Sequence, residues 1–225
     1  MAGRRIFELS GGRLCLDFVN TVDNRPTARA QDLLETYADL ALWSRQSGIL
    51  SPREERALVE RARRAPDEAL KVLERARFLR EAIFAIFSRG TKSALDALRK
   101  ALPSVYRRPV LRSGPGYELA WEEDPKALDR MLGPVLRSVV ELLTSRELDR
   151  VRVCGADNCD WLFLDESRSR SRQWCNMAVC GNRAKARRFY QRQRRRVLNR
   201  LKRLKRRGSP AGRRSAGTRG ELSRE

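Results

Sequence analysis

The chain of 225 residues contains no histidine. Histidine is the usual general base at neutral pH and a common metal ligand, so its absence excludes His-based catalytic triads and mixed Cys/His metal sites. The sequence also lacks a phosphate-binding loop, a nucleophile elbow and a paired-carboxylate arrangement. We therefore expect a protein that is not an enzyme.

Long apolar runs are missing as well. No stretch approaches the roughly 18 apolar residues that a membrane helix requires. The first residues, Met-Ala-Gly-Arg-Arg, lack the apolar segment of a signal peptide. We expect a cytoplasmic protein that does not bind a membrane.

Acidic residues are scarce relative to basic ones. The chain has 28 Asp and Glu against 49 Lys and Arg, which gives a net charge of +21. The excess is concentrated in residues 151–207, which hold 18 basic and 4 acidic residues. A surplus of this size indicates a polyanionic partner, with nucleic acid ahead of an acidic lipid surface.

Four of the five cysteines lie close together in the pattern Cys-x4-Cys-x15-Cys-x4-Cys. Two such pairs can fold back to complete a tetrahedron around zinc, so we interpret them as a closed Zn²⁺ site. The predicted ligands are Cys154, Cys159, Cys175 and Cys180. Three alternatives remain: disulfides, which are rare in a reducing compartment; an iron–sulfur cluster, whose usual spacings differ; and four unconnected core cysteines.

A basic segment with helical periodicity follows the last cysteine. We expect a helix from about Asn182 to Arg206 with one partly apolar face, which packs on the protein or on a second copy in a homodimer. That face comprises Ala186, Tyr190, Gln193, Val197, Leu201 and Leu204. The basic residues around it favour binding to nucleic acid, although a solvated helix and an RNA partner remain alternatives.

The predicted contacts to nucleic acid come from this helix and from the segment before the third cysteine. Arginines are expected to bind phosphates, and Gln173 and the residues near Asn182 to read base edges. The full set is Arg168, Arg170, Arg172, Gln173, Asn182, Arg183, Lys185, Arg187, Arg188 and Arg192. Trp161, Phe163 and Trp174 are interpreted as the core of a small finger domain.

Several motifs carry a resemblance to known families. The finger motifs are Cys154-x4-Cys159, Trp161-Leu-Phe-Leu-Asp165, Ser171-Arg-Gln-Trp174-Cys175-Asn-Met177 and Cys180-Gly-Asn-Arg183-Ala-Lys185. They closely resemble the CGNR zinc finger. The segment Leu14-Cys-Leu-Asp-Phe-Val-Asn-Thr21 resembles the ABATE domain that commonly precedes this finger. The resemblance implies a bacterial transcription regulator of the stress-induced type, with a DNA-binding finger and an N-terminal domain that senses a small-molecule effector.

Residues 1–150 are expected to form a helical domain with small β-hairpins, followed by the finger and basic helix at 151–207 and a disordered tail at 208–225. Little sequence resembles a flexible linker, so we expect the domain and the finger to pack together. Hairpins are predicted at 6–16 around Gly11-Gly12 and at 105–123. Helices are predicted at 31–48, from Ser51-Pro52, from Pro66, at 91–101 with a stop at Pro103, and from Asp124 with a kink or break at Gly133-Pro134.

Polar side chains within the first motif are the candidate effector site. Asp17, Asn20 and Thr21 are embedded in apolar sequence, where they either meet a ligand or cap the local backbone. Arg80 and Glu81 lie beside the apolar stripe of the helix from Pro66, where they either line a pocket or are solvated; we interpret them as solvated charges. Two further functions are retained as alternatives: an RNA- or ribosome-binding protein and a thiol redox sensor.

Overall fold

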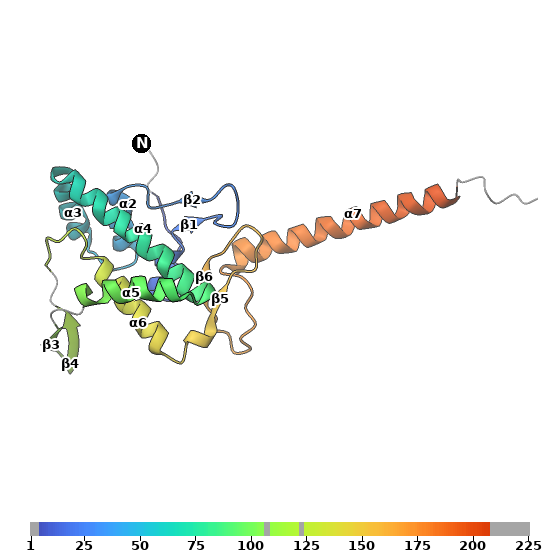
Figure 1. The fold of residues 1–225 in the computed structure, drawn as a ribbon. Coiled ribbons are helices and arrows are strands. Elements are labelled where there is room, and N and C mark those ends of the chain that lie inside the picture. The colour runs from blue at the N-terminus through green and yellow to red at the C-terminus, as the bar shows by residue number, and fades with distance from the viewer. Residues whose placement is uncertain (1–4, 106–108, 122–123, 208–225) are drawn as a thin grey trace, which may run out of the picture. The chain divides into compact units, whose positions relative to one another are not determined.

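Over the residues that the structure describes, the protein is mainly helical, with three small antiparallel sheets (Figure 1). A computed structural model describes residues 5–105, 109–121 and 124–207. The helices are α1 (Leu14–Val19), α2 (Tyr37–Gln46), α3 (Pro52–Arg64), α4 (Pro66–Arg89), α5 (Lys92–Val105), α6 (Leu132–Thr144) and α7 (Asn182–Arg207), with short turns of helix at η1 (Leu148–Arg150) and η2 (Met177–Gly181). The strands pair as β1 (Val22–Asp23) with β2 (Gln31–Asp32), β3 (Pro109–Ser113) with β4 (Tyr117–Trp121) and β5 (Val151–Val153) with β6 (Leu162–Leu164).

Two compact units divide the chain, one spanning Met1–Gly181 and the other beginning at Asn182. The main core of the first unit combines apolar side chains of helices α1 to α6 with Leu162 and Leu164 of β6. α1 lies deep in this core, where Phe18 packs against Trp43 with ring centroids 5.0 Å apart. The N-terminal helices and the finger strand therefore bury a shared surface, as expected from the lack of a linker.

Capping residues set where two of the helices begin. Thr36 and Asp39 form a reciprocal capping box at the start of α2, and Ser51 and Glu54 form another at the start of α3. The predicted start of α3 is confirmed. The prediction that helix α2 begins at Gln31 is wrong, because the chain caps at Thr36 and the preceding residues pair with β1 as strand β2.

The hairpin predicted around Gly11-Gly12 is also wrong. Residues 5–13 form no strand, and Gly12 adopts a left-handed backbone with φ of 80°. The carbonyl of Gly11 accepts a hydrogen bond of 2.8 Å from the Leu164 N–H, and the Gly11 N–H donates to Asp17 Oδ1 over 2.7 Å. This segment therefore bonds to a strand some 150 residues later instead of folding back on itself.

Most other predicted elements are confirmed, with changes at prolines. α4 begins at Pro66, and β3 and β4 pair across the turn at Ser113–Gly116. Pro103 does not end α5, which continues to Val105. The prediction that a helix begins at Asp124 is wrong, because residues 124–131 form turns and α6 begins only at Leu132. Pro134 lies in the first turn of α6, where a missing N–H breaks no helical hydrogen bond and causes no kink. The tail predicted to be disordered, 208–225, lies outside the described residues.

Membrane-crossing helices are not found in the described part of the chain. Over residues 5–105, 109–121 and 124–207, no helix combines the necessary length and apolar character.

Candidate metal centre and its surroundings

Four cysteines converge in the region that follows β5. Cys154 comes directly after β5, and its N–H donates to the Trp161 carbonyl over 2.8 Å, which continues the pairing of β5 with β6. Cys159 closes the first loop through its N–H to the Ala156 carbonyl at 2.9 Å. Cys180 lies in the wide turn η2, where its N–H donates to the Asn176 carbonyl at 2.9 Å. Short-range backbone bonds thus place three of the four cysteines, and the Cys175 N–H donates to Cys154 Sγ over 3.5 Å.

The four sulfur atoms form a compact, buried cluster. All lie within 4.8 Å of one another, with Sγ–Sγ distances of 3.7 Å between Cys159 and Cys175 and 3.6 Å between Cys175 and Cys180. A tetrahedral ion with metal–sulfur bonds of about 2.3 Å places its sulfurs about 3.8 Å apart. A disulfide requires about 2.05 Å, and all five cysteines of the chain are free. The geometry fits one tetrahedral ion and excludes both disulfides and unconnected core cysteines.

The four thiols are close enough to hydrogen-bond to one another. Donation from Cys159 and Cys175 lowers the pKa of the Cys154 thiol, and the same bonds raise the pKa of the two donors. A divalent ion would favour the thiolate form of all four, because its charge opposes their mutual repulsion.

Arg172 holds the loop that leads into the third cysteine. Its Nε donates to the Trp174 carbonyl over 2.9 Å, its Nη2 donates to the Cys175 carbonyl, and its guanidinium lies 4.5 Å from the Phe163 ring centroid. The buried Asp165 accepts from the N–H groups of Ser167 and Arg172, both at 2.9 Å. Hydrogen bonds from Ser167 and Arg172 lower the pKa of Asp165. Arg172 therefore has a structural role in the finger, and its predicted contact with nucleic acid stays a prediction.

The other residues predicted to contact nucleic acid lie at the surface. Arg168, Arg170 and Gln173 are exposed on the loop between Asp165 and Cys175. The remaining ones are exposed on α7, namely Asn182, Arg183, Lys185, Arg187, Arg188 and Arg192. The loop residues belong to the first compact unit and the helix residues to the second.

Hydrogen bonds connect the finger to residues on either side of α1. The Asn20 amide bonds to both backbone groups of Leu162, at 2.8 and 2.9 Å. The Trp161 indole N–H donates to the Val22 carbonyl over 2.9 Å. Two side-chain pairs add to these, Asn158 with Asn24 at 3.2 Å and Asn176 with Glu8 at 2.5 Å. Both cysteine loops are therefore positioned by residues from the start of the chain.

The three residues predicted to bind an effector take part in the fold. Thr21 is buried, donates its hydroxyl to the Phe18 carbonyl at 2.7 Å and accepts from Arg80 at 3.3 Å. The sequence left two roles open for these side chains, ligand binding and local backbone capping. Thr21 caps the local backbone, whereas Asn20 bonds to the distant Leu162. Asp17 accepts from Gly11, and burial raises the pKa of its carboxyl to about 6. Ligand binding by these side chains stays a prediction.

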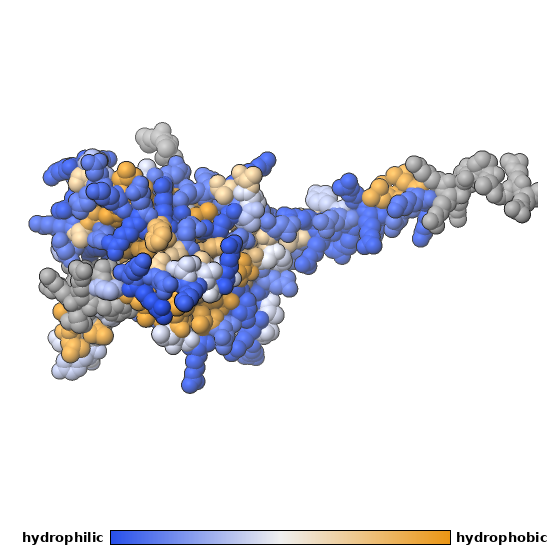
Figure 2. Space-filling view, in the orientation of Figure 1, coloured by the Kyte–Doolittle hydropathy of each residue, from blue (hydrophilic) through white to orange (hydrophobic). Residues whose placement is uncertain are grey.

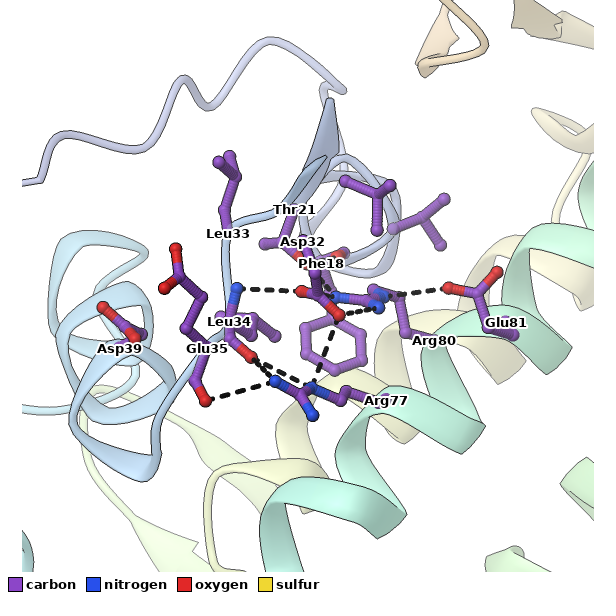
Figure 3. A network of polar contacts seen from close by, with 12 residues as sticks. Phe18, Thr21, Asp32, Leu33, Leu34, Glu35, Asp39, Arg77, Arg80 and Glu81 are labelled. Atoms are coloured by element: carbon purple, nitrogen blue, oxygen red, sulfur yellow. Dashed lines mark hydrogen bonds and ion pairs between the residues drawn. The ribbon is translucent and has the colours of Figure 1, made fainter. Parts of the chain in front are cut away.

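Sequence reasoning missed the ion pair beside Thr21, in which Arg80 is buried and Asp32 is partly exposed. Arg80 was interpreted as solvated, but only 3% of it is exposed, and its guanidinium forms two hydrogen bonds of 2.7 Å with the Asp32 carboxylate (Figure 3). Arg77 extends the network from the next turn of α4 to the carbonyls of Leu34 and Glu35. The helical periodicity indicates that Arg80 lies near an apolar stripe of α4. It cannot indicate that the β1–β2 hairpin places the Asp32 carboxylate next to Arg80.

Together these features define a helical domain fused to a four-cysteine metal finger that ends in a basic helix. The family comparisons agree with this class. Residues 12–146 match the ABATE family, described as "Putative stress-induced transcription regulator", and residues 150–193 match the CGNR zinc finger. The chain belongs to the ABATE family and carries a CGNR zinc finger, as the sequence motifs predicted. A comparison with curated proteins finds no match to the chain.

Proposed function

We propose that the protein is a zinc-dependent, DNA-binding regulator of transcription, in which the loop before Cys175 and helix α7 contact the DNA. The observation that carries this proposal is the composition of α7. Its 26 residues include 14 Lys and Arg and no Asp or Glu. Figure 2 shows hydrophilic residues along most of this helix.

A charge distribution of this kind suits a polyanion. A helix that only needs to be soluble carries both signs of charge, because Glu–Lys and Glu–Arg pairs four residues apart stabilise it. α3 follows that pattern, with Glu60 paired to Arg63 and Arg64 at 3.5 and 3.1 Å. α7 has fourteen like charges and no acidic residue to offset them, so phosphates are the partners that would relieve the repulsion.

Zinc is the metal that the donor set favours. Four thiolates without histidine or carboxylate select soft or borderline ions, and a tetrahedral S₄ site is typical of structural zinc. In such a site all four coordination positions are filled by protein. The proposed role of the metal is therefore to hold the two cysteine loops together and not to catalyse a reaction.

The N-terminal domain would supply regulation. Leu162 and Leu164 of the CGNR finger lie in the core that helices α1 to α6 form, and Asn20 after α1 bonds to Leu162. An effector that moved those helices would therefore also move the finger. We propose a small molecule as the effector, in keeping with a regulator that acts in the cytoplasm.

A salt titration tests the proposal. The zinc-loaded protein is titrated against fluorescein-labelled duplex DNA by anisotropy, at salt concentrations from 50 to about 300 mM. If about six arginines bind phosphates, the slope of log K against log salt should be about −5. Chelation followed by readdition of zinc should remove and restore binding. An affinity that does not depend on salt would contradict the proposal.

An RNA partner is the second candidate, because α7 exposes two aromatic rings. Phe189 and Tyr190 are 54% and 70% exposed, with ring centroids 5.8 Å apart. Exposed rings among arginines can stack on unpaired bases, which RNA loops provide. Competition between unlabelled duplex DNA and structured RNA at one salt concentration separates the two. Stronger competition by RNA would favour the second candidate.

A further inference from the structure

The finger has a concave surface beside the metal centre. The concavity has a volume of about 370 Å³, and the residues that line it flank Cys175 in the sequence. Its lining residues are Ser171, Arg172, Gln173, Trp174 and Met177. The residues combine an apolar wall with an amide, a hydroxyl and a guanidinium, so the surface is suited to a ligand with both apolar and hydrogen-bonding edges.

The apolar wall is built on a glycine. A methyl group added at Gly181 would overlap the Met177 sulfur and lie 3.1 Å from Trp174 Cδ1. The thioether and the indole therefore both rest against the Gly181 backbone. Met177 is 52% exposed even so. A small domain that leaves a methionine beside a tryptophan open to solvent has an apolar contact surface available for a partner.

The polar side of the concavity carries Gln173 and positive charge. The backbone carbonyl of Gln173 accepts from the Gly155 N–H over 2.9 Å, which fixes this residue to the first cysteine loop while its side chain is exposed. Arg172 is held by the Trp174 carbonyl. Arg168 and Arg170 are exposed on the same loop. An anionic ligand is therefore favoured over a neutral or cationic one.

One base pair matches an amide next to an apolar wall. In the major groove, an A·T pair presents the N7 acceptor and N6 donor of adenine, and beside them the methyl group of thymine. A glutamine amide can bond to both adenine atoms, and apolar side chains contact the methyl group. A G·C pair offers no methyl group, and a reversed pair exchanges the positions of the two features.

We infer that this concavity reads an A·T base pair, with Gln173 bonding to adenine and Met177 and Trp174 receiving the thymine methyl group. The inference rests on the proposed function, because it requires duplex DNA as the partner. In this arrangement the finger loop gives the protein its preference for a DNA sequence, whereas the phosphate contacts of α7 carry no sequence information.

Removal of a single methyl group tests the inference. Duplexes bound by the full-length, zinc-loaded protein are first selected from a random pool. Each dT of the selected site is then replaced singly by dU, which lacks only the methyl group. At one position the replacement should weaken binding about fourfold, the effect of exposing one buried methyl group. Gln173→Ala should reduce the preference for adenine at the same base pair at least fivefold.

Two variants make the test specific. Met177→Ala should make the fourfold difference between the dT and dU duplexes smaller, because only Trp174 then contacts the methyl group. Leu111→Ala removes an exposed apolar side chain of β3, outside the concavity, and should keep the fourfold difference. Zinc content is measured for each variant, so that a lost preference is not confused with a lost finger.

The outcomes distinguish this inference from the proposed function. Wild-type protein that binds no duplex DNA at low salt would overturn the proposed function itself. Protein that binds DNA without selecting an A·T pair would overturn the inference and leave DNA binding in place. The same holds if every dU duplex binds as tightly as the parent dT duplex. A fourfold dU effect that persists in Met177→Ala would also overturn it.

Discussion

The side-chain amide of Asn20 pairs with both backbone groups of Leu162. The Leu162 N–H donates to Asn20 Oδ1 over 2.8 Å, and Asn20 Nδ2 donates to the Leu162 carbonyl over 2.9 Å. Both residues are buried, so the amide bonds to β6 much as a neighbouring strand would. This pair joins α1 of the ABATE domain to the strand between the second and third cysteines.

Replacing Asn20 by Ala should destabilise both parts of the first unit together. The substitution leaves a buried N–H and a buried C=O of Leu162 without partners, each at a cost of about 1–3 kcal/mol. We expect the free energy of unfolding, measured with urea, to fall by about 3 kcal/mol. Asn199→Ala, on the exposed surface of α7, is the control and should change it by less than about 0.5 kcal/mol. A variant of Asn20 as stable as wild type would show that the pair contributes little.

Removal of the metal should weaken the helical domain as well as the finger. Leu162 and Leu164 lie in the same core as α1, α4 and α6, and β6 follows Cys159 by only two residues. We expect a chelator to lower the midpoint of the helical circular dichroism transition by about 10 °C or more, because metal binding contributes to the free energy of folding. The fluorescence of Trp161 should change in the same transition. Cys175→Ser should mimic the chelator.

Cys15→Ala is the matched control for the metal prediction. Cys15 is buried in α1, apart from the four-cysteine cluster. The variant should retain one metal ion per chain and remain sensitive to the chelator. If chelation changed the tryptophan signal but left the helical transition where it was, the finger and the domain would be energetically independent.

The carboxyl group of Asp17 should make stability depend on pH. Burial raises its folded-state pKa to about 6, and the Gly11 N–H opposes this only in part. Between about pH 4 and pH 6 the folded state therefore binds more protons than the unfolded state, so stability falls as pH rises through this range. Asp17→Asn should remove that loss and be more stable than wild type at pH 7, by up to roughly 3 kcal/mol.

Urea unfolding at pH 4, 5, 6 and 7 measures the effect of Asp17. The difference between wild type and Asp17→Asn should grow from pH 4 to pH 6 and then level off. Asp96→Asn, at a half-exposed site in α5, controls for the loss of one acidic residue. Parallel curves for wild type and Asp17→Asn would contradict the prediction.

Local signals in the sequence predicted much of this structure. The cysteine spacing predicted the metal centre because a tetrahedron constrains neighbouring residues, and Ser51 with Glu54 predicted the start of α3 because a capping box is complete within four residues. Partners distant in sequence were not predictable in the same way. Nothing near Gly11 indicates that its carbonyl bonds to Leu164.

Buried polar pairs show the same limit. Arg80 occupies a position on α4 where a charged side chain is usually solvated, and its burial depends on Asp32 from a hairpin 48 residues earlier. Asn20 was recognised as unusual for its apolar surroundings, but its partner comes 142 residues later. Sequence identified these side chains as candidates for a special role, and only the tertiary structure distinguishes a ligand contact from a bond within the fold.

Arginine-to-alanine substitutions in α7 should reduce the salt dependence of DNA binding without affecting the fold. Arg188 and Arg192 are exposed one turn apart, and alanine preserves the helix. If both bind phosphates, the double variant should lower the slope of log K against log salt by about 1.8, since each phosphate contact contributes about 0.9. Arg63 and Arg64 of α3 are equally exposed but paired with Glu60, so their double alanine variant has the same change in net charge. Because that control should leave the slope nearly unchanged, equal reductions in the two double variants would mean that overall charge, and not contact by α7, drives the binding.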